Sequence, residues 1–227
     1  MKNIVVLTGA GISAESGIQT FRDADGLWEG HNVLEVATPE GWELNPPLVL
    51  DFYNKRRAQL KEVTPNLAHT SLALLEKKFN VSIITQNVDD LHERAGSTNV
   101  IHLHGELLKS RSSVNDTLIY NCTTDIKMGD ICELKSQLRP HIVWFGEEVP
   151  MLDLAVEITS KAYILLIIGT SMQVYPAANL VNYVSRNTPI YFIDPKPAIQ
   201  KNQFENMTIL AEKASTGVAK IVSQLVD

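Results

Sequence analysis

Two histidines, His102 and His104, stand two positions apart just before Gly105, at the end of a short apolar run. An imidazole titrates near neutral pH, so a histidine at a strand end is well placed to act as a general base near a cleft. Residues two apart in a regular strand point to the same side, and the spacing therefore leaves both histidines as candidates. We expect structural or surface roles for the others, which are His31, His69, His92 and His141.

A second polar group, residues 85–90, follows another apolar run and reads Thr-Gln-Asn-Val-Asp-Asp. Asn87 or Asp89 could simply cap the helix that follows. A cap needs only one polar side chain, however, and several are present here. Ligands of open α/β sheets bind at the carboxyl ends of the strands, so this segment is a candidate ligand site.

Glycines follow a third run, where residues 9–14 fit the pattern G-x-G-x-x-G/A. Glycine lets the backbone turn tightly and approach a pyrophosphate, whose charge a following helix N-terminus stabilises. The usual acidic residue about 20 positions later is missing, so a simple turn explains this pattern equally well. Residues 169–171 and Asp194 end two further runs and could bind phosphate or ribose, although each also fits an ordinary turn.

The runs that must position these groups are β-branched and apolar almost throughout, as in strands covered on both faces. They are 4–7, 81–85, 100–103, 141–145, 163–168 and 190–193. Helices are predicted at 46–60, 65–79, 150–161, 176–184 and 217–226, with Asn45 as the N-cap of the first. This alternation predicts an α/β fold with a largely parallel sheet and helices on both faces.

Two stretches depart from the alternation. Residues 27–63 are helical and loop-like with no convincing strand, and residues 109–137 are polar. We expect them to form a smaller module beside the sheet. The predicted sheet domain comprises 1–26, 64–108 and 139–227, and the predicted small domain comprises 27–63 and 109–138.

Composition limits the class of protein. The chain has 227 residues, of which 44% are hydrophobic and 20% charged, and its formal net charge is −6. One domain with a small inserted module fits this length. The negative charge disfavours duplex DNA and anionic membranes as partners. Two cysteines, Cys122 and Cys132, are too few for a disulfide framework.

Neither a targeting segment nor a membrane span is predicted. The apolar part of residues 1–7 is too short for the core of a signal peptide. The longest apolar run, 162–168, is far too short to cross a membrane. We expect a soluble cytoplasmic protein without a membrane or a specific nucleic-acid partner. The sequence makes no prediction of the oligomeric state.

In order and spacing, these segments resemble the sirtuin family of NAD-dependent protein deacylases along the whole chain. The matching segments are Gly9-Ala10-Gly11-Ile12-Ser13, Ser16-Gly17-Ile18, Thr20-Phe21-Arg22, Thr85-Gln86-Asn87-Val88-Asp89, His102-Leu103-His104-Gly105, Val143-Trp144-Phe145-Gly146-Glu147 and Gly169-Thr170-Ser171. The resemblance implies a Rossmann-like NAD-binding domain and acyl-lysine protein substrates. NAD would be consumed rather than used for hydride transfer, giving nicotinamide and O-acyl-ADP-ribose.

The resemblance also implies residue roles. His104, rather than His102, matches the catalytic base of the family, and Asn87 belongs to the catalytic group. The implied NAD-binding residues are Gly9, Ala10, Gly11, Phe21, Arg22, Gln86, Asn87, Asp89, Gly169, Thr170, Ser171 and Asp194, the last where many relatives carry asparagine. The substrate backbone should pair as an added strand with a segment that includes Val143, Phe145, Gly146 and Glu147.

Three residues indicate the acyl group. Tyr53 and Arg56 lie at i and i+3 of a predicted helix and match the Tyr-x-x-Arg pair of sirtuins that remove succinyl and malonyl groups. Ala37 matches the small residue that widens the acyl pocket in those relatives. Without this resemblance, a solvated helix face would be the favoured interpretation. We expect removal of succinyl and malonyl groups, and of acetyl groups as well.

The chain departs from the family in the region 109–137, where most sirtuins bind a structural zinc through four cysteines in two pairs. Arg111-Ser112-Ser113 stands where the first pair would begin, and only Cys122 and Cys132 remain. Structural zinc normally has four Cys or His ligands. We therefore expect no zinc here and two ordinary reduced thiols.

Other functions could use the same pocket. One is ADP-ribosyl transfer or NAD hydrolysis, and another is sensing of NAD or O-acyl-ADP-ribose without catalysis. Intact His104 and Asn87 count against a sensor, which need not keep a base. An NAD dehydrogenase is disfavoured because the acidic signal after the second strand is absent.

Overall fold

The computed structural model describes residues 1–19, 27–28, 30–198 and 204–226. Its described strands include a six-stranded parallel sheet in the order β11-β10-β9-β1-β4-β5. These strands are β1 (Asn3–Thr8), β4 (Asn80–Thr85), β5 (Val100–His102), β9 (Ile164–Ile168), β10 (Ile190–Ile193) and β11 (Met207–Leu210). The chain starts in the middle, builds one side through β4 and β5, and then crosses to build the other. The strand order therefore reverses between β1 and β9, and ligands bind at such a switch point.

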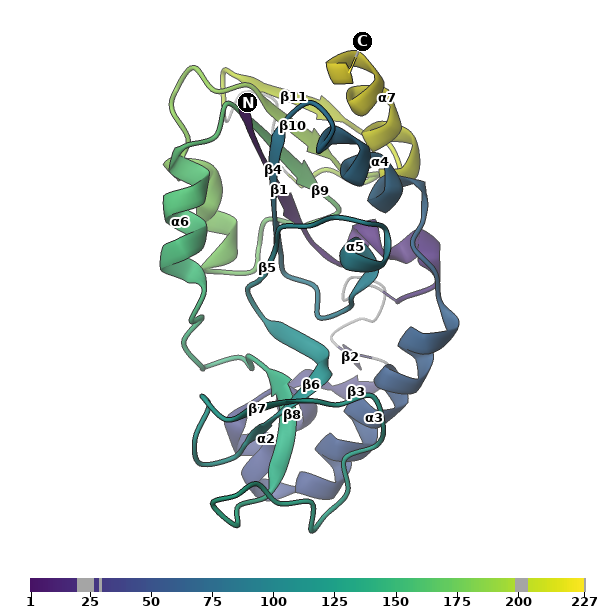
Figure 1. Ribbon diagram of the computed structural model, residues 1–227, viewed down its shortest axis with the longest axis vertical. Helices are drawn as coiled ribbons and strands as arrows, with labels where there is room; N and C mark the ends of the chain where they lie inside the picture. Colours follow the sequence, from purple (N-terminus) through teal and green to yellow (C-terminus); the bar gives the residue numbers. More distant parts are fainter. Residues whose placement is uncertain (20–26, 29, 199–203, 227) are drawn as a thin grey trace.

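Helices cover both faces of this sheet, as Figure 1 shows. Side chains of β1 alternate between two cores. Ile4 and Val6 pack with α4 (Leu67–Leu75) and α7 (Ala214–Val226), whereas Val5 and Leu7 pack with α6 (Leu152–Ser160) and the 3-10 helix η4 (Ala177–Tyr183). Two-sided burial explains why these strands are apolar throughout. The predicted α/β fold is confirmed.

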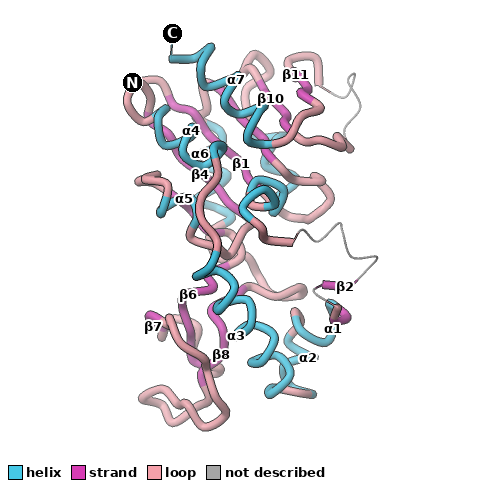
Figure 2. Tube along the Cα trace, turned by 90° about the vertical axis from the view of Figure 1, so that its right-hand side faces the viewer, coloured by secondary structure: helices cyan, strands magenta, loops and turns pink. Residues whose placement is uncertain are grey.

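A smaller unit lies at the other end of the long axis (Figure 1). Its three-stranded antiparallel sheet has the order β7-β6-β8, formed by β6 (Gly105–Ser112), β7 (Ile119–Asn121) and β8 (Leu138–Ile142). Figure 2 shows α3 (Pro46–Glu62) between this sheet and the short helices α1 (Val33–Val36) and α2 (Pro39–Leu44). The two-stranded ribbon of β2 (Leu27–Trp28) and β3 (His31–Asn32) precedes α1.

The expected elements differ from the structure in several places. The run 141–145 was expected in the parallel sheet, but β8 ends at Ile142 and pairs antiparallel with β6. The expected helix at 176–184 is the 3-10 helix η4. Strands lie where none was expected, at β2, β3, β6, β7 and β11. Asn45 caps α3 as predicted, because its Oδ1 accepts the Leu48 N–H at 3.2 Å. The division into two domains stays a prediction, and the small sheet extends from 105 to 142.

Side-chain hydrogen bonds tie the polar segment 113–137 to the rest of the protein. The Asn54 amide on α3 both donates to the Ile126 carbonyl and accepts the Ile126 N–H, each at 2.9 Å. The Cys132 thiol donates to Ser112 Oγ at 3.3 Å. Both cysteines are free thiols with buried side chains. These contacts hold the segment 113–137 in place, although its polar composition did not predict them.

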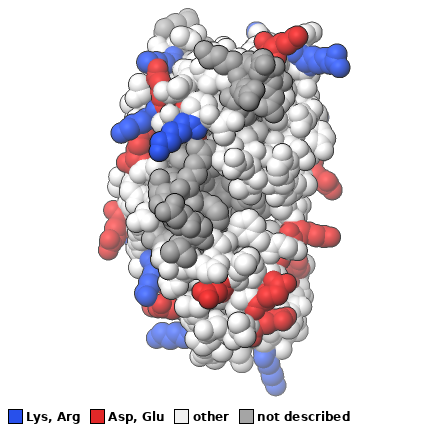
Figure 3. All heavy atoms as spheres, turned by 180° about the vertical axis from the view of Figure 1, so that it is seen from behind, with Lys and Arg blue, Asp and Glu red and all other residues white. Residues whose placement is uncertain are grey.

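None of the described helices is both long and apolar enough to cross a membrane. On the face seen in Figure 3, basic side chains of the described residues lie near the margin, and acidic ones lie both near the margin and within the lower half of the face. They do not gather into one basic area on that face.

Candidate active site

The carboxyl ends of the central strands bring several predicted site residues to one edge of the sheet. Gly9 follows β1, Gln86 follows β4 and Thr170 follows β9, so these residues come from three adjacent strands. Gln86 Nε2 donates to Thr170 Oγ1 at 3.2 Å and so links the loops on either side of β1. Asp194 follows β10, is almost fully buried, and accepts the Lys196 N–H at 2.8 Å. These residues surround the switch point of the sheet.

The glycines at this edge pack against one another. The Gly11 N–H donates to the Gly169 carbonyl at 2.8 Å. A Cβ on Gly11 would lie 2.6 Å from the Gly169 Cα, and Gly169 has a left-handed φ of 61°. Two 3-10 helices, η1 (Ala10–Ile12) and η2 (Ala14–Ser16), follow β1. The glycine pattern therefore allows close packing of two turns, and no long helix points its N-terminus at this edge from residues 10–16.

A buried chain of hydrogen bonds orients Asn87. Its Nδ2 donates to Ser13 Oγ at 3.1 Å, and Ser13 Oγ donates to Asp89 Oδ2 at 3.0 Å. The other carboxylate oxygen of Asp89 accepts the Leu91 N–H at 3.2 Å, at the start of α5 (Leu91–Arg94). Burial raises the pKa of Asp89, against the two hydrogen bonds that favour its ionised form. Ser13 lies in a predicted motif, but its bridging position depends on contacts more than 70 residues apart in sequence.

The two neighbouring histidines have different partners. His104 Nδ1 lies 3.0 Å from the Gln86 carbonyl and must donate to it. No described residue bonds to His104 Nε2, which can therefore carry the lone pair of a neutral imidazole. Burial lowers the pKa of His104, and the Gln86 carbonyl opposes this only in part. His102 uses both ring nitrogens, at 3.0 Å from the Asn87 carbonyl and 2.8 Å from Glu93 Oε1.

The residues expected to select the acyl group share a core with the small module. Ala37 and Tyr53 belong to the same buried cluster as Trp144. The Trp144 indole N–H donates to Tyr53 Oη at 3.1 Å. Burial raises the pKa of Tyr53, although the nearby charge of Arg56 opposes the shift. The solvated-face interpretation does not fit, because Arg56 is only 9% exposed and lies 5.6 Å over the Phe52 ring.

The segment 143–147 connects His104 to the buried cluster that holds Ala37 and Tyr53. The Val143 N–H donates to the His104 carbonyl at 2.9 Å, and the Phe145 N–H donates to the Ala37 carbonyl at 3.0 Å. These two amide donors are thus already engaged, while the Phe145 side chain is 46% exposed. Gly146, with a φ of 91°, lies in the turn that follows. Pairing of a substrate strand here stays a prediction.

Glu147 has mainly internal partners. Its carboxylate accepts from Arg111 at 3.0 Å and Arg139 at 2.8 Å, and it accepts the Trp144 N–H at 2.7 Å. Arg139 also lies over the Trp144 ring, 3.3 Å from its centroid. This network fixes Trp144, and through it the Tyr53 phenol. Local sequence pattern could not predict this network, because Arg111 lies 36 positions from Glu147 and Tyr53 lies 91 positions from Trp144.

Four predicted site residues remain to be placed. Phe21 and Arg22 lie outside the described residues. Ala10 and Ser171 are partly buried at the same sheet edge, Ala10 in η1 and Ser171 just after β9. Among the described residues, no group of three or more His, Cys, Asp or Glu side chains could hold a metal ion. Absence of zinc remains a prediction.

Comparisons with known proteins agree with this geometry. Residues 9–176 match the model of the Sir2 family. The NAD-dependent protein deacylase of Helicobacter pylori is 56% identical over 227 residues, covering 100% of this chain and 99% of that protein. The one from Bacteroides thetaiotaomicron is 54% identical over 232 residues, covering 100% of this chain and 99% of that protein. A solved Sir2 homolog–NAD complex has a TM-score of 0.88 at 38% identity and covers 99% of this chain and 90% of that one. This chain therefore belongs to the Sir2 family.

Proposed function

We propose that this chain removes succinyl, malonyl and acetyl groups from lysine and works best on the acidic ones. It is an NAD-dependent protein deacylase of the Sir2 family. The observation that carries the proposal is the juxtaposition of two sites. His104 lies at the switch-point edge with a proton-accepting Nε2, and the segment 143–145 connects it to Ala37 in the core that also holds Tyr53. The segment 143–145 would thus join the catalytic base to the residues that select the acyl group.

The residues at the sheet edge fit NAD. Ser13, Asn87 and Asp89 are polar side chains that are buried together at the carboxyl ends of β1 and β4. Because Asn87 Nδ2 is committed to Ser13, the carbonyl oxygen of the same amide is left as an acceptor for a ribose or carboxamide donor. NAD, when bound, would supply an ADP-ribosyl group with nicotinamide as its leaving group. The family relation and the solved homolog–NAD complex support this use of the site.

His104 would act as the general base. Its Nδ1–H is held by the Gln86 carbonyl, which fixes the tautomer and places the lone pair on Nε2. The lowered pKa keeps this imidazole neutral, and able to accept a proton, at neutral pH. The products would be free lysine, nicotinamide and O-acyl-ADP-ribose.

Arg56 and Tyr53 would bind the terminal carboxylate of a succinyl or malonyl group. Such a carboxylate loses its water on entering an apolar core, which is unfavourable without a partner. The Arg56 guanidinium offers a planar pair of donors, and the Tyr53 phenol, held by Trp144, offers another. Ala37 leaves room for a chain longer than acetyl. Acetyl-lysine is neutral and shorter, so it needs neither partner.

The test of this preference is kcat/KM on matched succinyl and acetyl peptides. Hydrogen bonds to a charged group contribute about 1.5–3 kcal/mol, or roughly 10- to 150-fold in selectivity. Arg56→Met should therefore lose mainly succinyl and malonyl activity, and Tyr53→Phe should do so more weakly. Lys55→Met is the matched control, because Lys55 is on the same helix but is exposed and paired with Asp51 at 2.8 Å. It should leave both activities unchanged.

Two results would contradict the assignment. An equal loss on acetyl and succinyl peptides would mean that Arg56 supports the fold or the NAD site. Unchanged activities in Arg56→Met would mean that it plays no part in acyl selection.

A further inference from the structure

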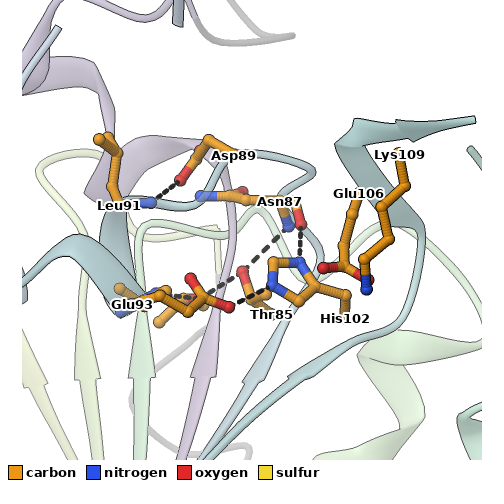
Figure 4. Close-up of polar contacts among 10 residues, drawn as sticks. Thr85, Asn87, Asp89, Leu91, Glu93, His102, Glu106 and Lys109 are labelled. Carbon is orange, nitrogen blue, oxygen red and sulfur yellow. Dashed lines mark hydrogen bonds and ion pairs between the residues drawn. The ribbon is translucent and has the colours of Figure 1, made fainter. Parts of the chain in front are cut away.

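His102, which the proposed mechanism does not use, lies between two acceptors at the end of β5. Its side chain is only 8% exposed. Figure 4 shows its ring between the Asn87 backbone and Glu93 of α5. The distances are 3.0 Å from Nδ1 to the Asn87 carbonyl and 2.8 Å from Nε2 to Glu93 Oε1.

This geometry requires two donors on one ring. A carbonyl oxygen can only accept, and so can an ionised carboxylate. A neutral imidazole has a single N–H and could satisfy only one of these partners. Both bonds are made at once only when His102 is a positively charged imidazolium, whereas His104 needs only one N–H.

The charged groups around His102 favour that state overall. Burial by itself would lower the pKa of His102, but the hydrogen bond and charge of Glu93 outweigh it, and the pKa is raised. Burial opposes ionisation of Glu93, yet the His102 bond holds the pKa of Glu93 below its usual range. The titratable and charged groups that face this pair are Asp89 before α5, His92 on α5, and Glu106 and Lys109 on β6.

The Asn87 carbonyl belongs to the residue whose amide is oriented by Ser13 and Asp89. Asn87 is therefore held from two sides, by its side chain and by its backbone. We propose that His102, as an imidazolium paired with Glu93, is a positioning residue that fixes the Asn87 backbone for NAD binding, so that loss of its charge weakens NAD use. This inference rests on the proposed function only in taking Asn87 as a contact of NAD.

The effect of pH on the hydrogen bonds of His102 has a definite direction. Because the pKa of His102 is raised, its ring makes both hydrogen bonds at lower pH, and the pair of bonds is lost as pH rises through that pKa. Glu93→Gln removes the charge but keeps the shape and an acceptor oxygen, so His102 should lose its proton at lower pH. His104 should be unaffected, because its bond is to the Gln86 carbonyl.

The experiment compares the unmodified protein, Glu93→Gln and Glu106→Gln in three measurements across pH. Histidine NMR gives the pKa of His102, with His102→Asn identifying its signal among the six histidines. Calorimetry gives the dissociation constant of NAD, and steady-state kinetics give kcat/KM for NAD. Glu106→Gln is the matched control, because Glu106 faces His102 but pairs with Lys109 at 2.6 Å.

In Glu93→Gln, the pKa of His102 and the alkaline loss of NAD affinity should move together to lower pH. At pH values between the two measured pKa values of His102 the variant should bind NAD about tenfold more weakly, while at pH values below both the two proteins should agree. Glu106→Gln should shift both quantities less. A shifted pKa without a shift in NAD affinity would overturn the proposal, and so would an unshifted pKa. The calorimetry remains decisive if no deacylation is found, which separates this proposal from the proposed function.

Discussion

At the residue scale, the hydrogen bonds of His102 and His104 separate two side chains that sequence spacing could not. A proton acceptor needs a ring nitrogen that carries no proton and faces no hydrogen-bond acceptor, and His104 Nε2 meets that condition among the described residues. His102 does not, since both of its nitrogens face acceptors. The resemblance to sirtuins favoured His104, and the geometry supports the same choice through an independent physical criterion.

Replacement of His104 tests its role as base. In His104→Ala, deacylation should fall by about 10²–10⁴-fold, the usual effect of losing a general base. NAD binding and the melting temperature should change little, because His104 donates a single hydrogen bond to the Gln86 carbonyl. The measurements are single-turnover rates, calorimetric NAD binding and thermal unfolding. Full activity in the folded variant would rule out His104 as the base.

At the element scale, the sequence predicted the apolar strands well and the polar ones poorly. The runs that became β1, β4, β9 and β10 are apolar because helices cover both of their faces. In β6, by contrast, Ser110, Arg111 and Ser112 are buried although they are polar. Arg111 is tolerated there because Glu147, 36 positions away, neutralises it. Such a partner cannot be found from local pattern, and β6 was missed for that reason.

The same limit applies to the site. Gln86, Asn87, His104 and Thr170 were predictable because they follow apolar strands. Trp144, Ser13 and Glu93 act through contacts between distant segments, and their roles became visible only in three dimensions.

The contacts of the polar segment 113–137 lead to a prediction about the zinc content of the protein. Asn54 and the bond from Cys132 to Ser112 restrain this segment, so the module need not depend on zinc for its restraint. Elemental analysis of untagged protein should find well under one zinc per chain, and a chelator should not lower the melting temperature. A stoichiometric zinc that survives dialysis would show that the ligand count was misread.

At the scale of the whole molecule, buried histidines should make stability depend on pH. His69 is fully buried and its ring centroid lies 4.9 Å from that of His92. Burial lowers the pKa of His69 to about 4 and that of His92 well below its usual value. A group with a lowered folded pKa binds its proton more readily in the unfolded chain. The free energy of unfolding should therefore decrease as pH falls from about 6.5 toward 4.

His69→Gln isolates one of these groups. His69 Nδ1 accepts the Asn66 N–H at the start of α4, and glutamine can make the same capping contact without titrating. The loss of unfolding free energy between pH 7 and pH 5 should be about 2 kcal/mol smaller in the variant. Urea unfolding at the two pH values measures it, with His31→Gln as the control. An identical loss in His69→Gln and in the unmodified protein would show that His69 is not buried as a neutral group.

The central claim is that one site joins NAD consumption to removal of acidic acyl groups. The most direct measurement is mass spectrometry of reactions that contain NAD and matched acetyl-, succinyl- or malonyl-lysine peptides. We predict nicotinamide, the free lysine peptide and O-acyl-ADP-ribose in equal amounts, with faster turnover of succinyl and malonyl peptides than of the acetyl peptide. Release of plain ADP-ribose with the peptide still acylated, or transfer of ADP-ribose to the peptide, would contradict the claim.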